Sequence, residues 1–170
     1  MELNKDIKIQ NILSIDFDWV ESLKDMEELI VYINKNINKD KKIIFSYYHD
    51  NIYSLFKHGV NEYNLVNIDK HHDYSYDVNR NNMMDEGNWL FHLSNVFIKK
   101  INYIWISKNN SEHNKNTNLR KNLKNFNFYN FLSEIPNLNF DTYFFCCSPE
   151  CSNQFSNTAY EIIRKIYDIK

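Results

Sequence analysis

Short segments rich in Ile, Val, Phe and Tyr recur along the chain, and each is too brief to form a helix. Apolar runs of this length are typical of strands that are buried on both faces of a sheet. We therefore predict strands at 11–16, 42–47, 64–69, 101–106 and 141–146.

Four other segments carry apolar residues at helical spacing. The clearest of them, 22–37, begins with Ser22 and has Asp25 three residues later, an arrangement typical of a helix N-terminus. We predict helices at 22–37, 51–57, 88–99 and 156–167. The polar run 107–118 is expected to be a mobile surface loop.

Predicted strands and helices alternate along the chain, without the Asn-Gly or Asp-Gly pairs that mark tight hairpins. This order favours an α/β fold in which a mostly parallel sheet is covered by helices on both faces. A chain of 170 residues, 43% of them hydrophobic, fits one domain of ordinary size. We expect residues 1–170 to form a single three-layer domain.

Charge and composition exclude several classes of function. The net charge is -2 and the lysines are scattered, so the sequence gives little reason to expect nucleic acid as a partner. Only Gly59 and Gly87 are glycines, which excludes the glycine-rich dinucleotide and phosphate-binding loops. A small or peptide substrate fits this composition better, and a homo-oligomer stays open.

The N-terminus lacks a basic start before an apolar stretch, and no apolar run approaches ~18 residues. Neither export nor a membrane span is expected. The three cysteines, Cys146, Cys147 and Cys151, lie too close together for a secreted disulfide framework and are expected to be free, buried thiols. A reducing, cytoplasmic setting is therefore the expectation.

Two acidic runs stand at the ends of predicted strands. Asp16 and Asp18 end the first strand, and Asp69, His71 and Asp73 end the third. Alternate residues of an extended strand point the same way, so the members of each run should share a face. Carboxyl ends of parallel strands meet at one edge of the sheet, where these side chains would repel one another unless cations lay between them.

The second predicted strand ends near His49, which would bring a sixth ligand to the same edge. Carboxylates and imidazoles without thiolates suit Mn²⁺ or another hard to borderline divalent ion. Two ions that share a carboxylate would hold a bridging water, which loses a proton near neutral pH. The sequence therefore predicts a two-metal site for Mn²⁺ or a similar divalent ion, and a hydrolytic activity.

These residues resemble those of the arginase/deacetylase-type metallohydrolases, and within them the small UPF0489 branch, which includes peptide arginases. In that branch the Asp-x-Asp run precedes the Asp-x-His-x-Asp run, as it does here, whereas ordinary arginases have the opposite order. The resemblance spans nearly the whole chain and rests on His49 and on the segments 15–19, 68–73, 87–90 and 147–150.

The resemblance implies an arginase-like fold and a ligand set for each of two manganese ions. One set would be His49, Asp69, Asp73 and Asp16, and the other Asp69, His71, Asp16 and Asp18. The implied reaction is hydrolysis of a guanidino group, most simply that of arginine in a peptide, which leaves ornithine and releases urea.

The resemblance also suggests roles for residues outside the ligand set. Asp69 and His92 would be catalytic, with His92 as the proton shuttle to the leaving amine. Glu150 would pair with the guanidinium, and Asn88 would contact the substrate. His72 should point away from His71 along an extended strand and serve packing.

Several alternatives stay open at this point. Pocket walls set substrate choice, so the same site could act on another C–N or amide bond, such as a free guanidino compound or an acetylated amine. A non-catalytic metal-binding domain would keep the ligands without turnover. An N-terminal Asp-x-Asp also begins phosphatases of the haloacid dehalogenase type, an interpretation that gives no role to His49 or to the 69–73 run.

Overall fold

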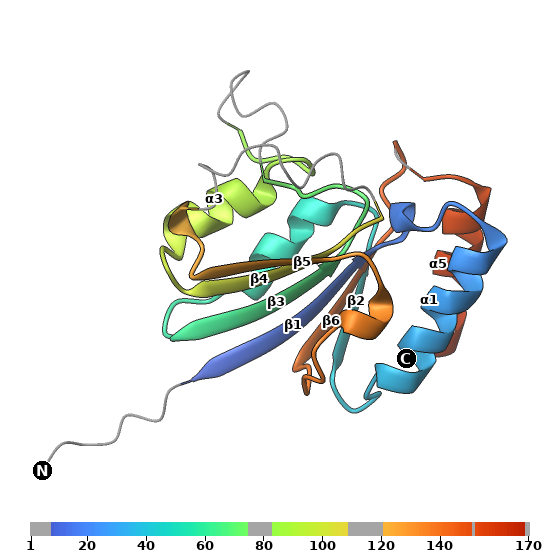
Figure 1. Cartoon of the computed structure of the whole chain (residues 1–170), viewed down its shortest axis with the longest axis horizontal. Coiled ribbons are helices and arrows are strands. Elements are labelled where there is room, and N and C mark those ends of the chain that lie inside the picture. Colours follow the sequence, from blue (N-terminus) through green and yellow to red (C-terminus); the bar gives the residue numbers. More distant parts are fainter. Residues whose placement is uncertain (1–7, 75–82, 109–120, 151, 169–170) are drawn as a thin grey trace, which may run out of the picture.

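A computed structural model describes residues 8–74, 83–108, 121–150 and 152–168. Six strands form one sheet in the order β2-β6-β1-β3-β4-β5, and every neighbouring pair is parallel. This confirms the predicted α/β class, with a sheet that is parallel throughout (Figure 1). The strands are β1 (Ile9–Asp16), β2 (Lys42–Ser46), β3 (Glu62–Ile68), β4 (Ile101–Ile106), β5 (Asn125–Tyr129) and β6 (Thr142–Cys146).

The five predicted strands are confirmed, with ends that shift by a few residues. β5 was not predicted from the sequence. It lies at an edge of the sheet and alternates exposed Asn125 and Asn127 with half-buried aromatic residues, so it lacks the apolar run that identified the others.

Helices cover both faces of the sheet, as predicted. α1 (Leu23–Asn36) and α5 (Gln154–Tyr167) lie side by side on one face, and α3 (Trp89–Val96) with the 3-10 helix η2 (His49–Leu55) lies on the other (Figure 1). Ser22 caps α1 by accepting from the backbone N–H of Asp25, as the sequence indicated. The predicted helix at 51–57 is instead η2, which begins earlier, at His49.

Two apolar cores lie on the two faces of the sheet, because successive strand residues point to opposite sides. Leu13 and Ile15 of β1 pack under α1 and α5, whereas Ile12 packs on the opposite side with residues of η2 and α3. Ser14 and Asp16 share the side of Ile12. The polar end of β1 therefore faces η2 and α3.

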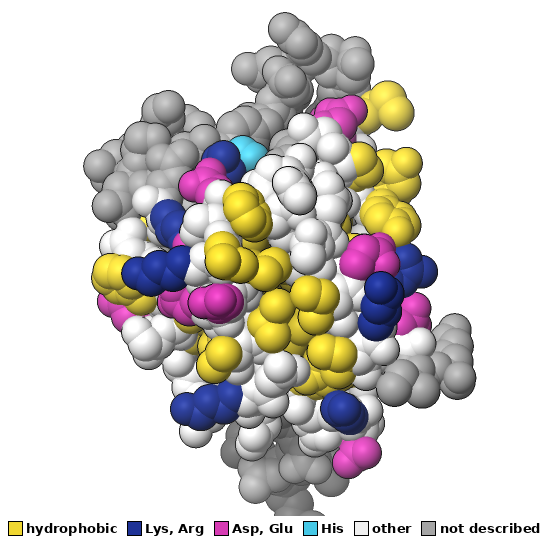
Figure 2. Space-filling model, turned by 90° about the vertical axis from the view of Figure 1, so that its right-hand side faces the viewer, with side chains coloured by type: hydrophobic (Ala, Val, Ile, Leu, Met, Phe, Trp, Pro, Cys, Tyr) yellow, Lys and Arg dark blue, Asp and Glu magenta, His cyan; other side chains and the backbone are white. Residues whose placement is uncertain are grey.

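Leu23 and Val31 of α1 are exposed. The side of the molecule that α1 and α5 form shows hydrophobic side chains among charged ones (Figure 2). Among the described residues, no helix combines the length and apolar character that crossing a membrane requires. Cys146 and Cys147 are free and buried, as predicted. Cys151 and the 109–118 part of the predicted loop lie outside the described residues.

Candidate metal centre

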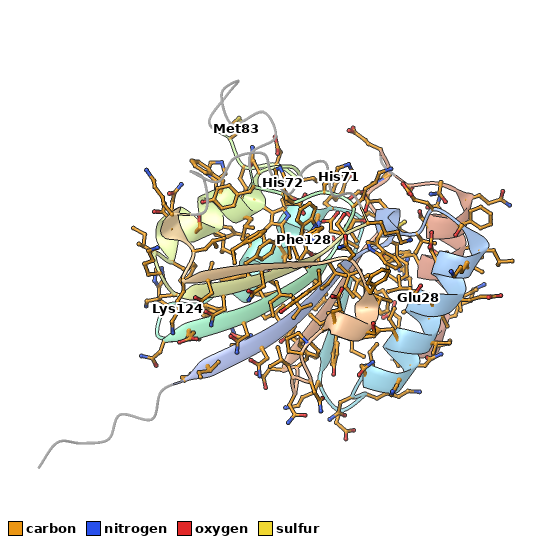
Figure 3. The ribbon with its side chains drawn as sticks, viewed as in Figure 1. Glu28, His71, His72, Met83, Lys124 and Phe128 are labelled. Carbon is orange, nitrogen blue, oxygen red and sulfur yellow. The ribbon has the colours of Figure 1, made fainter. Side chains whose placement is uncertain are left out.

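The candidate site lies beyond the carboxyl ends of β1 and β3, which are neighbours in the sheet. From β1 the chain crosses to β2 on one side, and from β3 it continues to β4 on the other. Connections that leave adjacent parallel strands in opposite directions open a crevice between them, which is where α/β proteins bind ligands. His71 lies at this edge of the sheet (Figure 3).

Asp16 and Asp18 reach the crevice by a different local geometry from the one expected. Asp16 is the last residue of β1, but the chain then turns into the 3-10 helix η1 (Phe17–Trp19), so the strand does not continue to Asp18. The backbone N–H of Asp18 donates to Oδ1 of Asp16 over 3.2 Å, which closes this turn. Both carboxylates are buried and lie together.

The 69–73 run also leaves the strand, since β3 ends at Ile68. The backbone N–H of His71 donates to Oδ1 of Asp69 over 2.8 Å, and that of Lys70 donates to Oδ1 of Asp18 over 3.2 Å. Asp73 has a left-handed backbone, with φ of 51°, a conformation that Asp tolerates better than most residues. The strand-based expectation was therefore wrong in its geometry, although the side chains do converge.

His49 joins the two acidic segments. It does not end β2, which stops at Ser46, but begins η2. Its Nδ1 lies 3.5 Å from Oδ2 of Asp16, 3.2 Å from Oδ2 of Asp69 and 3.0 Å from Oδ2 of Asp73. Its Nε2 lies 2.9 Å from Oγ of Ser14, which fixes the plane of the ring.

Two groups of side chains have the geometry to hold a cation, and they share Asp69. One contains Asp16, His49 and Asp69, and the other contains Asp18, Asp69 and His71; within each group the potential ligand atoms lie within 4.8 Å of one another. In the second group, Nδ1 of His71 lies 2.9 Å from Oδ2 of Asp18. The six residues singled out in the sequence thus come together, with Asp73 beside His49.

Without cations between them, the buried carboxylates of this cluster repel one another. Burial and the nearby carboxylates raise the pKa of Asp16 and of Asp69 to about 7, and burial with the charge of Asp69 raises that of Asp18 to about 6. Burial by itself lowers the pKa of His49, but the carboxylates of Asp73 and Asp69 raise it well above 6.5. Positive charge is therefore strongly favoured among these carboxylates.

Side chains outside the ligand set hold the carboxylates in place. Trp89, the first residue of α3, donates its Nε1–H to Oδ2 of Asp73 over 2.8 Å, and the backbone N–H of Leu90 donates to the carbonyl oxygen of Asp73. Nδ2 of Asn67 donates to Oδ2 of Asp69 over 3.2 Å. These contacts orient the carboxylates before any ion binds.

A cavity of about 250 Å³ opens beside the cluster. Glu150 lines it and is exposed, consistent with a position at its entrance. Sequence reasoning assigned no role to Glu86, which precedes the 87–90 segment, or to Ser148, which lies within the 147–150 segment. The lining residues are Asp16, Asp18, His71, Asp73, Glu86, Gly87, Ser148 and Glu150.

Three residues singled out in the sequence lie elsewhere. His92 is in α3, where its buried Nε2 lacks a hydrogen-bond partner, and it is not among the described residues that line the cavity. The side chain of Asn88 bonds the backbone of Met83 and Asp85 instead of facing the cavity. His72 packs near Trp105, which agrees with its predicted packing role.

Comparisons of this chain with models of protein families, with curated proteins and with solved structures find no match. The resemblance to the arginase-like branch therefore stays an interpretation of the sequence motifs. The side chains that the fold brings together are the basis for assigning a function.

Proposed function

We propose that this protein is a binuclear manganese-dependent hydrolase that cleaves a guanidino group, with arginine in a peptide as the substrate and ornithine and urea as products. The observation that carries the proposal is the pair of cation-binding groups that share Asp69 at the crevice between β1 and β3. A shared carboxylate is the feature that holds two ions close enough to act on one water.

The chemistry of the donor atoms fits two hard to borderline divalent ions. Every potential ligand atom in the two groups is a carboxylate oxygen or an imidazole nitrogen, a set that suits Mn²⁺. Adjacent ligands of an octahedral ion with bonds of about 2.1 Å lie about 3 Å apart. The contacts of His49 with Asp69 and Asp73, at 3.2 and 3.0 Å, have this spacing.

Each residue then has a distinct part in the proposed reaction. Asp16, His49 and Asp69, with Asp73 beside His49, would hold one ion, and Asp18, Asp69 and His71 the other. Two bound ions supply a water of lowered pKa and neutralise charge that develops on the substrate. Ser14 keeps Nδ1 of His49 turned toward the carboxylates through its contact with Nε2.

The cavity supports a positively charged substrate. Glu150 lines it, and no Lys or Arg is among the described lining residues. A guanidinium can form two parallel hydrogen bonds with a carboxylate, which an acetylated amine cannot. The exposed position of Glu150 also suits a side chain presented by a peptide.

The phosphatase alternative is less well supported by these contacts. It requires Asp16 to be a free nucleophile, whereas Asp16 lies 3.5 Å from His49 and also accepts a hydrogen bond from Ser148. Asp69 and Asp73 surround the same imidazole. A buried His within a ring of aspartates has a role in metal binding and none in that reaction.

Metal content and urea release test the proposal. The protein is purified without chelators, its metals are measured by mass spectrometry, and urea is assayed with an arginine-containing peptide on the same sample. We expect about two manganese ions per chain and urea production that EDTA abolishes and Mn²⁺ restores.

The matched variants are Asp69→Asn, which alters the shared ligand, and Asp40→Asn, which alters an exposed Asp far from the site. The first should lose metal and urea release, and the second should keep both. If the protein binds metal but releases no urea, its substrate is another C–N compound or its role is binding alone. Absence of bound metal after Mn²⁺ is supplied would reject the site.

A further inference from the structure

The 83–88 loop presents Glu86 to the cavity beside the metal cluster. Glu86 lines this cavity together with Gly87, and its carboxyl lies within hydrogen-bonding reach of Ser148. Ser148 in turn donates to Oδ2 of Asp16 over 2.7 Å. Glu86 is therefore close to the ligand set while standing outside it.

The side chain of Asn88 holds this loop through hydrogen bonds to its backbone. Its side-chain Oδ1 accepts from the backbone N–H of Asp85 over 2.9 Å, and its Nδ2 donates to the carbonyl oxygen of Met83 over 3.1 Å. The backbone N–H of Gly87 donates to Oδ1 of Asp85 over 2.9 Å. Asn88 is almost completely buried, so these contacts hold the turn in one arrangement that carries Glu86.

The charge of the loaded cavity depends on Glu86. Four aspartates surround the ligand positions, and their charge balances that of two divalent ions. Glu86 and Glu150 are the remaining acidic residues that line the cavity, and no Lys or Arg accompanies them among the described lining residues. A cavity with this balance attracts a cation and disfavours a neutral or anionic group.

We propose that Glu86 is a specificity-determining residue that selects a cationic substrate group, and that Asn88 is the positioning residue that holds it there. This inference rests on the proposed function and deepens it, because it explains a preference for a guanidinium over a neutral amide. Glu86 and Glu150 both line the cavity and come from separate loops, so each offers a carboxylate to a cation bound there.

The test compares a peptide with its neutral counterpart. The manganese-loaded protein is given acetyl-Gly-Arg-Gly-amide as substrate, and the same peptide with citrulline in place of arginine as competitor. In Glu86→Gln we expect KM for the arginine peptide to rise about tenfold, with kcat changed less than about threefold, because a charge-assisted hydrogen bond is replaced by a neutral one. The inhibition constant of the citrulline peptide should stay unchanged.

Two further variants separate this role from a general loss of structure. Glu28→Gln changes an exposed carboxylate on α1, away from the site (Figure 3), and should behave as the wild type. Asn88→Ser should raise KM in the same direction as Glu86→Gln while metal content stays at the wild-type value. A KM that is equal in Glu86→Gln and in the wild type would overturn the proposal.

Peptide binding separates a wrong reaction from a wrong role of Glu86. If the wild type releases no urea, calorimetric binding of the two peptides replaces the assay. Tighter binding of the arginine peptide, lost in Glu86→Gln, would support the selection of a cation and leave the reaction to be found. Equal binding of both peptides by the wild type would reject the role of Glu86.

Discussion

Ser148 and Asp16, 132 residues apart in the chain, are joined by a 2.7 Å hydrogen bond in which the Ser148 hydroxyl donates to Oδ2. β6 ends at Cys146 directly beside the end of β1, with Asp16 paired to Cys146 in the parallel register. The segment that follows β6 thus supports the candidate ligands through Ser148, although Ser148 is not itself a ligand. The hydrogen bond also favours the ionised form of Asp16, the form that binds a metal.

Ser148→Ala should therefore weaken metal binding while the fold is retained. We expect manganese affinity to fall about tenfold, the lower end of the effect seen when partners of metal ligands are removed. Titration of the metal-free protein with Mn²⁺ in a calorimeter measures this change. Ser133→Ala, an exposed serine in η4 (Leu132–Glu134), is the control and should bind Mn²⁺ as the wild type does.

The stability of the metal-free protein should fall as pH rises. Asp16, Asp18 and Asp69 have pKa values raised from 3.8 to about 7, 6 and 7, so the folded chain holds protons that the unfolded chain has lost. Hydrogen bonding to Asp18 raises the pKa of His71 from 6.5 to about 9, which acts in the same direction. These contributions are complete at low pH and are lost as pH rises from about 4 to 9.

Thermal melts in EDTA should therefore give a higher Tm at pH 5 than at pH 8. Mn²⁺ should raise Tm more at pH 8, because ligands must lose their protons before they bind. A Tm in EDTA that is the same at both pH values, or higher at pH 8, would show that these ionised carboxylates do not destabilise the metal-free protein.

Trp89 links the helix α3 to the candidate metal centre, and its substitution should affect both stability and metal binding. Trp89→Phe keeps most of the buried ring but removes the 2.8 Å hydrogen bond to Asp73. We expect a loss of about 1 kcal/mol in the free energy of unfolding, because the buried carboxylate of Asp73 loses one hydrogen bond and keeps its contact with His49. Urea denaturation measures this change, and calorimetry should show weaker Mn²⁺ binding.

Tyr160→Phe provides the comparison, since it removes a hydrogen bond to the carbonyl oxygen of Ser46 on the opposite face of the sheet. This variant should lose stability and keep the Mn²⁺ affinity of the wild type. Equal effects of the two substitutions on Mn²⁺ affinity would argue against a specific role of Trp89 in holding Asp73.

Much of the fold could be predicted from the sequence, because buried parallel strands need short continuous apolar runs and helices need a regular apolar face. β5 escaped prediction because an edge strand with exposed Asn125 and Asn127 needs neither. The contribution of His49 was anticipated, but its position at the start of η2 was not. That position depends on how η2 packs against β1 and α3, which local patterns do not encode.

The sequence by itself determined which residue types could form a metal site and at which edge of the sheet they would gather, because carboxyl ends of parallel strands share one edge. Tertiary structure decided the contacts. The turn at η1 brings Asp18 to the imidazole of His71, and the left-handed backbone of Asp73 accompanies its contact with His49. Glu86 and Ser148 enter the cavity from distant loops, whose positions follow from packing and hydrogen bonds that no local pattern specifies.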